Sequence, residues 1–172
     1  MKMQDQREIK APRAVVFAAI LDPEVLKDCI PGASSVEGNV SDGYEAVVTQ
    51  KVGPVKATFK GAVQMSEIVE NEKITITGEG KGGAAGFAKG GAVVTLEELE
   101  PELTRLSYDV EAKVGGKLAQ LGSRIIDGFA KKMADQFFAN LQEGLEGPAE
   151  TAEAEAEEAP KKGWLKRLTG KD

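Results

Sequence analysis

Residues 78–91, GEGKGGAAGFAKGG, are the stretch of the chain most suggestive of a chemical site, because seven glycines surround two lysines. A phosphate-binding loop places such glycines between a strand and a helix, so that backbone amides and the helix N-terminus meet the anion. Here the segments on both sides, 73–79 and 92–99, have the composition of strands, and neither Lys81 nor Lys89 stands in a Gly-Lys-Ser/Thr order. We therefore predict a hairpin with glycines at positive φ. It is either a plain connection or the mouth of a cavity that a ligand or partner approaches closely.

The residue types that most enzymes and metal centres depend on are nearly absent. The chain has no histidine, and Cys29 is its one cysteine, which excludes Ser-His-Asp and Cys-His catalysis, His-ligated metals and cysteine-rich clusters. A long predicted helix carries Asp127 and Asp135 beside Arg124 and Lys131, but i,i+4 charge pairs are typical of a solvated face. The sequence therefore predicts no catalytic residue and no metal ligand.

Length and charge narrow the class of protein further. The 172 residues suffice for one domain with a core, and no apolar run approaches the ~20 residues that span a bilayer. The first residues contain no apolar segment of a secretory signal, and a single cysteine fits a reducing cytoplasm. A net charge of −6 argues against nucleic acid as a partner. We expect a cytoplasmic protein.

Hydrophobic periodicity predicts an α+β domain over residues 1–146. After a first strand and two short helices, we expect about six antiparallel strands and then a long helix with a continuous apolar stripe. The segments are strand 3–9, helices 11–21 and 23–30, strands that include 44–52, 56–66, 73–79, 92–99 and 106–114, and the helix 117–142. The apolar stripe of the helix must be buried, so a curved antiparallel sheet of about seven strands should wrap around it. Such an arrangement usually leaves a cavity.

The last 26 residues differ in composition from the domain. Residues 147–160, GPAETAEAEAEEAP, contain five glutamates, no basic residue and almost no large apolar group, which predicts a disordered linker. Residues 161–172 then combine apolar and basic side chains, which predicts a weak, reversible anchor on an anionic membrane. Its expected membrane-binding residues are Lys161, Lys162, Trp164, Leu165, Lys166, Arg167 and Leu168. A solvated tail and a protein-docking peptide are the alternatives.

Four segments, in the same order along the chain, resemble the CoxG family of carbon monoxide dehydrogenase accessory proteins. They are DPEVLKDCIPG (22–32), KVGPVKATFKG (51–61), GEGKGGAAGFAKG (78–90) and AKVGGKLAQLGSRIIDG (112–128). The resemblance covers about residues 1–142 and implies the START-like (SRPBCC) helix-grip fold. It also implies an accessory protein, since molybdenum, iron–sulfur clusters and flavin sit in other subunits. The family is thought to link the dehydrogenase to the inner face of the cytoplasmic membrane and to handle its quinone acceptor.

The inward faces of the predicted strands and of the long helix supply our candidate ligand-binding residues. They are Phe59, Val63, Met65, Ile76, Phe87, Leu96, Tyr108, Val110, Leu121, Ile125, Phe129 and Met133. A mostly apolar cavity with few polar groups suits an isoprenoid or lipid, and Tyr108 is placed to hydrogen-bond a quinone carbonyl. The alternative is that these side chains form a dry core.

Together these observations predict a non-enzymatic adaptor. It would recruit carbon monoxide dehydrogenase, or a related molybdenum hydroxylase, to the membrane and bind ubiquinone or menaquinone non-covalently. It would thereby link the dehydrogenase to the respiratory chain. The alternatives are a recruitment or maturation factor without a ligand, a generic lipid-binding START-like protein, and a START-like cyclase or hydrolase. The absence of histidine weighs against the enzyme.

Overall fold

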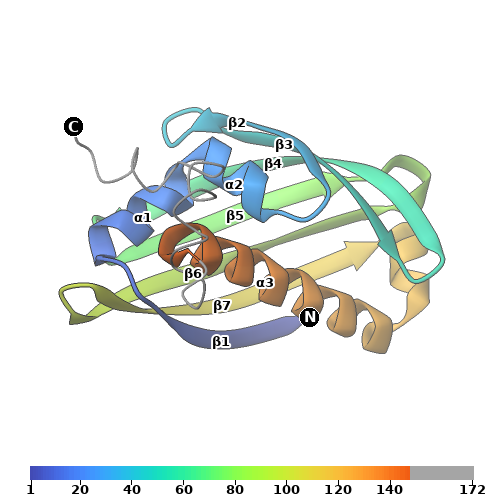
Figure 1. Ribbon diagram of the computed structural model, residues 1–172. Coiled ribbons are helices and arrows are strands. Elements are labelled where there is room, and N and C mark those ends of the chain that lie inside the picture. Colours follow the sequence, from blue (N-terminus) through green and yellow to red (C-terminus); the bar gives the residue numbers. More distant parts are fainter. Residues whose placement is uncertain (148–172) are drawn as a thin grey trace.

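A long C-terminal helix lies across a seven-stranded antiparallel sheet, with two short helices beside it (Figure 1). The computed structural model describes residues 1–147, so most of the predicted linker and the whole predicted tip 161–172 lie outside the described residues. The elements, with η for 3-10 helices, are β1 (Lys2–Ile9), α1 (Arg13–Leu21), α2 (Pro23–Cys29), β2 (Ala33–Asn39), β3 (Gly43–Val52), β4 (Val55–Val69), β5 (Lys73–Lys81), η1 (Gly83–Ala85), β6 (Phe87–Glu100), β7 (Leu103–Gly115), η2 (Gly116–Leu121) and α3 (Ser123–Glu146).

The strands follow the order β1-β7-β6-β5-β4-β3-β2, so each strand from β2 to β7 pairs with its sequence neighbour. The first strand joins the last, and Met3 lies opposite Val110 in that pair. Short connections between consecutive strands favour such a meander, and the twist of a large sheet makes it curve around α3. The predicted α+β architecture is confirmed.

The two short helices begin where the sequence places helix-starting residues. Pro12 precedes α1, and the Asp22 carboxylate accepts a hydrogen bond from the backbone N–H of Glu24 at 2.9 Å, with Pro23 in the first turn of α2. A capping aspartate followed by proline is a strong helix start, because it satisfies an amide that has no helical partner. This connection places α1 and α2 together at one end of the sheet (Figure 1).

The predicted helix over residues 117–142 is wrong at both ends. Residues Gly116–Leu121 form the 3-10 helix η2, and Gly122, at φ +90°, separates it from α3. This backbone conformation is one that glycine adopts without steric cost, so the chain changes direction there. At the other end α3 continues to Glu146, because Leu145 is 2% exposed and packs in the core. No predicted segment corresponds to the edge strand β2, since its sequence ASSVEGN has little β propensity.

The glycine-rich stretch is a hairpin, as predicted, with β5 and β6 paired across it. Its turn is short: the Gly82 amide donates to the Gly86 carbonyl at 2.8 Å. Positive φ occurs at Gly83 and Gly86, whereas the other five glycines lie in strands or at the start of the turn without it. Within the strands the glycines serve close approach instead: a Cβ on Gly90 would collide with the carbonyl oxygen of Glu111.

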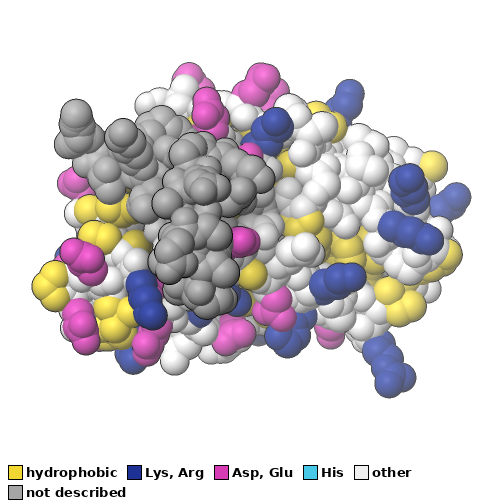
Figure 2. Space-filling model, in the orientation of Figure 1, with side chains coloured by type: hydrophobic (Ala, Val, Ile, Leu, Met, Phe, Trp, Pro, Cys, Tyr) yellow, Lys and Arg dark blue, Asp and Glu magenta, His cyan; other side chains and the backbone are white. Residues whose placement is uncertain are grey.

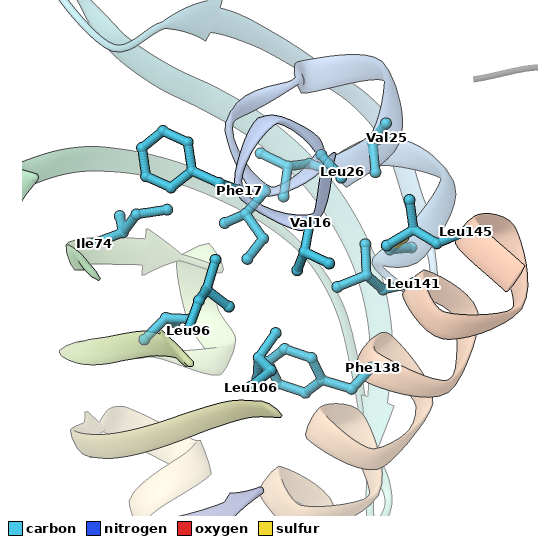
Figure 3. Packing of buried hydrophobic residues seen from close by; sticks show 14 of the residues in the cluster. Val16, Phe17, Val25, Leu26, Ile74, Leu96, Leu106, Phe138, Leu141 and Leu145 are labelled. Carbon is cyan, nitrogen blue, oxygen red and sulfur yellow. The ribbon is translucent and has the colours of Figure 1, made fainter. Parts of the chain in front are cut away.

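The hydrophobic core fills only one end of the space between the sheet and α3. It is built from α1, α2, the inner faces of several strands and the last part of α3 (Figure 3). The buried side chains of α3 are Phe138, Leu141 and Leu145, all within its last nine residues. Toward its N-terminus α3 contributes no fully buried side chain, so that half of the helix covers something other than core.

Candidate functional site

A cavity of about 800 Å³ occupies the other end, beneath the first half of α3. Its walls come from the inner faces of β3 to β7, from β1, from η2 and from one face of α3. Among its lining residues, polar side chains are limited to five: Gln50, Tyr108, Lys113, Ser123 and Asp127. The volume and apolar lining are those of a small-molecule site rather than of a packing defect.

The cavity arises because large side chains of α3 face small residues of the sheet. Ile126, Phe129, Met133 and Phe137 recur at three- and four-residue steps along the helix, yet each is only half-buried. The strands opposite contribute small side chains or none at Gly80, Ala88, Ala92 and Ala112. Helix and sheet are therefore too far apart here to fill the space with their own atoms, and apolar surface stays available to a ligand.

Tyr108 lies where the core ends and the cavity begins. Its ring stacks on Phe138, with centroids 4.7 Å apart and planes 12° apart, and the residue is 6% exposed. The Tyr108 hydroxyl has no hydrogen-bond partner among residues 1–147. Burial, and then the charge of Asp5, raises the pKa of the Tyr108 phenol above its usual value. It remains a neutral donor at physiological pH, available to a ligand carbonyl.

The cavity opens near the start of α3. The lining residues that are fully exposed are Lys113, Ala119, Gly122, Ser123 and Asp127, all within residues 113–127. Deeper residues such as Val94 and Tyr108 are buried. On the α2 side, the Gln50 side-chain amide donates to the Pro31 carbonyl at 2.6 Å and thereby closes that wall. The polar groups thus lie mainly at the rim, and the interior is apolar.

Six of the twelve predicted ligand-binding residues line this cavity: Phe59, Ile76, Tyr108, Val110, Phe129 and Met133. Met65 and Leu96 instead belong to the packed core at 7% and 5% exposure, and Val63 packs against that core. Alternation identified their inward direction correctly, but both the core and the cavity lie along the same inner face. Whether the six residues bind a ligand stays a prediction.

Three predicted residues lie at the open end and outside the cavity wall. Phe87 and Ile125 are 39% and 42% exposed, and Leu121 packs beside the β3–β4 turn. The helix begins later than predicted, after a 3-10 segment of different pitch, so Ile126 rather than Ile125 faces the cavity.

Several lining residues were missed by the sequence reasoning. The alternation of the segment 44–52 could have identified Val48 and Val52, and the apolar stripe of the helix already contained Phe137. No local signal marks Met1 and Met3, since they reach the cavity only because β1 pairs with the distant β7. Long-range pairing of this kind is not encoded in the pattern of either strand alone.

The charged helix face is solvated, as its spacing suggests. The ammonium of Lys131 lies 2.8 Å from the Asp135 carboxylate, which raises the pKa of Lys131, while Asp127 stands at the cavity rim. Within residues 1–147 no three His, Cys, Asp or Glu side chains gather in a way that could hold a metal ion. Nor is any helix of that part of the chain long and apolar enough to cross a bilayer.

The sequence profile of CoxG, described as a subunit of carbon monoxide dehydrogenase, matches residues 6–146, nearly the whole described domain. A search of curated proteins gives no match. Among solved structures, a conserved protein from Geobacillus kaustophilus is 29% identical with a TM-score of 0.77, covering 83% of this chain and 93% of that one.

Two more distant structures share the fold. A START superfamily protein from Mycobacterium smegmatis is 15% identical with a TM-score of 0.62, covering 82% of this chain and 94% of that one. A protein from Chromobacterium violaceum is 22% identical with a TM-score of 0.59, covering 83% and 95%. At these identities the likeness shows a START-like fold.

Proposed function

The chain belongs to the CoxG family of carbon monoxide dehydrogenase, and on that premise we propose that it is a non-enzymatic carrier and recruiter. Its cavity binds a hydrophobic quinone, ubiquinone or menaquinone. The chain brings carbon monoxide dehydrogenase, or a related molybdenum hydroxylase, to the inner face of the cytoplasmic membrane. Electrons from the dehydrogenase thereby reach the respiratory chain through the bound quinone.

One observation carries the ligand part of this proposal: an apolar cavity of about 800 Å³ ends at a buried, unpartnered phenol. A quinone combines an apolar ring and isoprenoid tail with carbonyl acceptors. Its ring fits beside the Tyr108–Phe138 stack, where the Tyr108 hydroxyl donates to a carbonyl, and the tail extends toward the open rim. Burial of the half-buried stripe on α3 supplies the affinity, at roughly 25 cal/mol per Å² of apolar surface.

The cavity offers little that would support catalysis. Its polar groups are spread around the rim, and Gln50 is already bonded to the Pro31 carbonyl. Tyr108 holds its proton, because burial raises the pKa of its phenol, and no basic side chain is bonded to it among residues 1–147. These features support a binding role over general acid–base chemistry.

Recruitment to the membrane rests on family membership and on the sequence of residues 161–172. The basic and apolar tip suits anionic lipid, and the acidic segment before it would keep the acidic domain away from the same surface. In a sedimentation assay with anionic vesicles, the full chain should carry the dehydrogenase into the pellet. Removal of residues 161–172 should leave much less dehydrogenase there, and an unchanged pellet would refute the anchor role.

Quinone binding is tested by filling the cavity from the helix. Ala130 lines the cavity, whereas Ala139 is exposed on the same helix and outside its wall. Ligand-free protein is titrated with detergent-dispersed ubiquinone and menaquinone, and the complex is counted by native mass spectrometry. Ala130→Trp should abolish the one-to-one complex and Ala139→Trp should preserve it. Equal binding by both variants would place the quinone elsewhere, and no binding by the wild-type chain would leave a protein-only recruiter.

A further inference from the structure

The charged side chains of the described domain divide between its two ends. One end, which we call the basic end, holds the β3–β4 and β5–β6 turns and the start of α3; its segments are residues 51–61, 79–89 and 113–127. These segments carry eight Lys or Arg and two Asp or Glu. Figure 2 shows dark-blue Lys and Arg gathered at the side where Figure 1 places these turns. An anionic surface would be attracted to this end.

The opposite end has the reverse charge. It holds the β2–β3, β4–β5 and β6–β7 turns, in residues 37–45, 66–73 and 97–105. These segments carry ten Asp or Glu and two Lys or Arg. The domain is therefore an electrical dipole along its long sheet, and an anionic surface would orient it with the basic end inward.

The cations of the basic end are free to meet a partner. All are exposed: Lys51, Lys56, Lys60, Lys81, Lys89, Lys113, Lys117 and Arg124. None of them forms a salt bridge with another residue of 1–147, in contrast to Lys2, Arg105 and Lys131. Their charge is consequently not neutralised within the domain, and they come from three separate segments rather than from one pocket shaped for a single carboxylate.

The same end carries exposed apolar side chains around the opening of the cavity. Ile125 and Phe87 are 42% and 39% exposed. Ile125 stands beside Leu121, and both contact the β3–β4 turn, where the position of a Cβ on Gly53 lies 3.7 Å from Ile125 Cγ2 and 3.9 Å from Leu121. The exposed lining residues of the cavity lie in the same stretch, 113–127. Apolar tips ringed by cations are the surface chemistry of proteins that rest on anionic bilayers.

We propose that the basic end of the domain docks on an anionic phospholipid bilayer. The lysines contact phosphate headgroups, Ile125 and Phe87 reach the boundary between headgroups and acyl chains, and the cavity opens toward the lipid. This goes beyond recruitment by residues 161–172, because it gives the domain its own membrane face and a fixed orientation. Exchange of an apolar ligand across that face rests on the proposed function, whereas the docking itself does not.

The first test compares two full-length variants of equal net charge. One replaces four cations of the basic end by glutamine: Lys51, Lys56, Lys117 and Arg124. The control replaces four cations outside it: Lys10, Arg13, Lys27 and Lys73. Binding to vesicles of phosphatidylglycerol and phosphatidylcholine is measured by sedimentation. About a fivefold loss per headgroup contact predicts at least a roughly hundredfold weakening for the first variant and only a few-fold weakening for the control. Equal weakening would overturn the proposal.

The second test reads the orientation on the membrane. Cys29 is fully buried, so a cysteine introduced by Ile125→Cys can be labelled selectively with an environment-sensitive fluorophore. Val69→Cys is the matched control, because Val69 is 47% exposed at the acidic end. Spin-labelled lipid in the vesicles should quench the label at position 125 and leave that at 69 unchanged. Equal quenching, or none at position 125, would overturn the proposal.

A protein partner is separated from lipid by adding the dehydrogenase. If the basic-end variant binds vesicles normally but no longer retains the dehydrogenase, the surface is a protein interface and the lipid proposal is wrong. Binding of detergent-dispersed quinone is measured on the same variant. None of its four substitutions lies in the cavity wall, so quinone binding should be unchanged. Loss of vesicle docking with retained quinone binding thus separates the two proposals.

Discussion

Alanine substitutions at Leu141 and Phe129, on the same helix, should separate its core half from its cavity half. Leu141 is fully buried, and truncation of such a leucine costs about 2–5 kcal/mol of unfolding free energy. At about 2–4 °C per kcal/mol for a domain of this size, Leu141→Ala should lower the melting temperature by roughly 10 °C. The ring of Phe129 is half-buried against an empty cavity of about 800 Å³.

Truncation of Phe129 therefore removes few packing contacts, and alanine is the better helix former by about half a kcal/mol. Phe129→Ala should change the unfolding free energy of the ligand-free chain by less than about 1 kcal/mol. Denaturant unfolding of the stripped protein measures both variants. If Phe129→Ala is as destabilising as Leu141→Ala, the cavity is collapsed in solution and the reasoning fails.

The same pair should behave in the opposite way toward quinone. Ligand at about a hundred times its dissociation constant stabilises a protein by about 2.7 kcal/mol. Loss of the Phe129 ring should weaken binding about tenfold, which removes roughly half of this stabilisation. Leu141→Ala, away from the cavity wall, should keep it in full. Equal quinone-induced shifts in the two variants would contradict the assignment of Phe129.

Three further predictions concern the tyrosines and glycines. Tyr108→Phe keeps the stack on Phe138 and should weaken quinone binding about tenfold while leaving the binding of a hydrocarbon of similar size unchanged, as titration calorimetry would show. Burial raises the pKa of Tyr44 and of Tyr108 above 10.0, so the folded chain holds these protons more tightly than the unfolded chain and its stability should fall as pH rises above about 10. The ultraviolet absorbance of phenolate reports both groups, since the chain has two tyrosines, and ionisation below pH 10 would contradict this. Gly90→Ala should cost more than about 2 kcal/mol in denaturant unfolding because its Cβ meets the β7 backbone, whereas Gly83→Ala, at φ +60° in open space, should cost about 1–2 kcal/mol; equal costs would refute the steric reason.

Much of the fold was predictable because its signals are local. The Asp22–Pro23 pair marks the start of α2, and strict alternation marks β4 and β7. The break at Gly122 was not predictable, because the apolar spacing of residues 117–142 continues through it. A glycine within a helical pattern is compatible with either a continued or an interrupted helix. Only the packing of Leu118 beneath η2 decides between them.

The site was predictable in direction and not in depth. Alternation places Leu96 and Ile76 on the same inner face, yet the first is core and the second lines the cavity. The difference arises because α1 and α2 cover one end of the sheet and leave the other end to α3 alone. Their position depends on long-range packing, which no single segment of the sequence encodes. The division between core and cavity is therefore a property of the tertiary structure.

The central claim is that the cavity carries a quinone, and the ligand that accompanies the native protein tests it most directly. The full chain is purified from the cells that produce it, without added lipid or detergent, and its organic extract is analysed by mass spectrometry. The account predicts one ubiquinone or menaquinone per chain, and much less from an Ala130→Trp chain prepared in the same way. An extract free of quinone, even after incubation of the protein with quinone-loaded vesicles, would contradict the account.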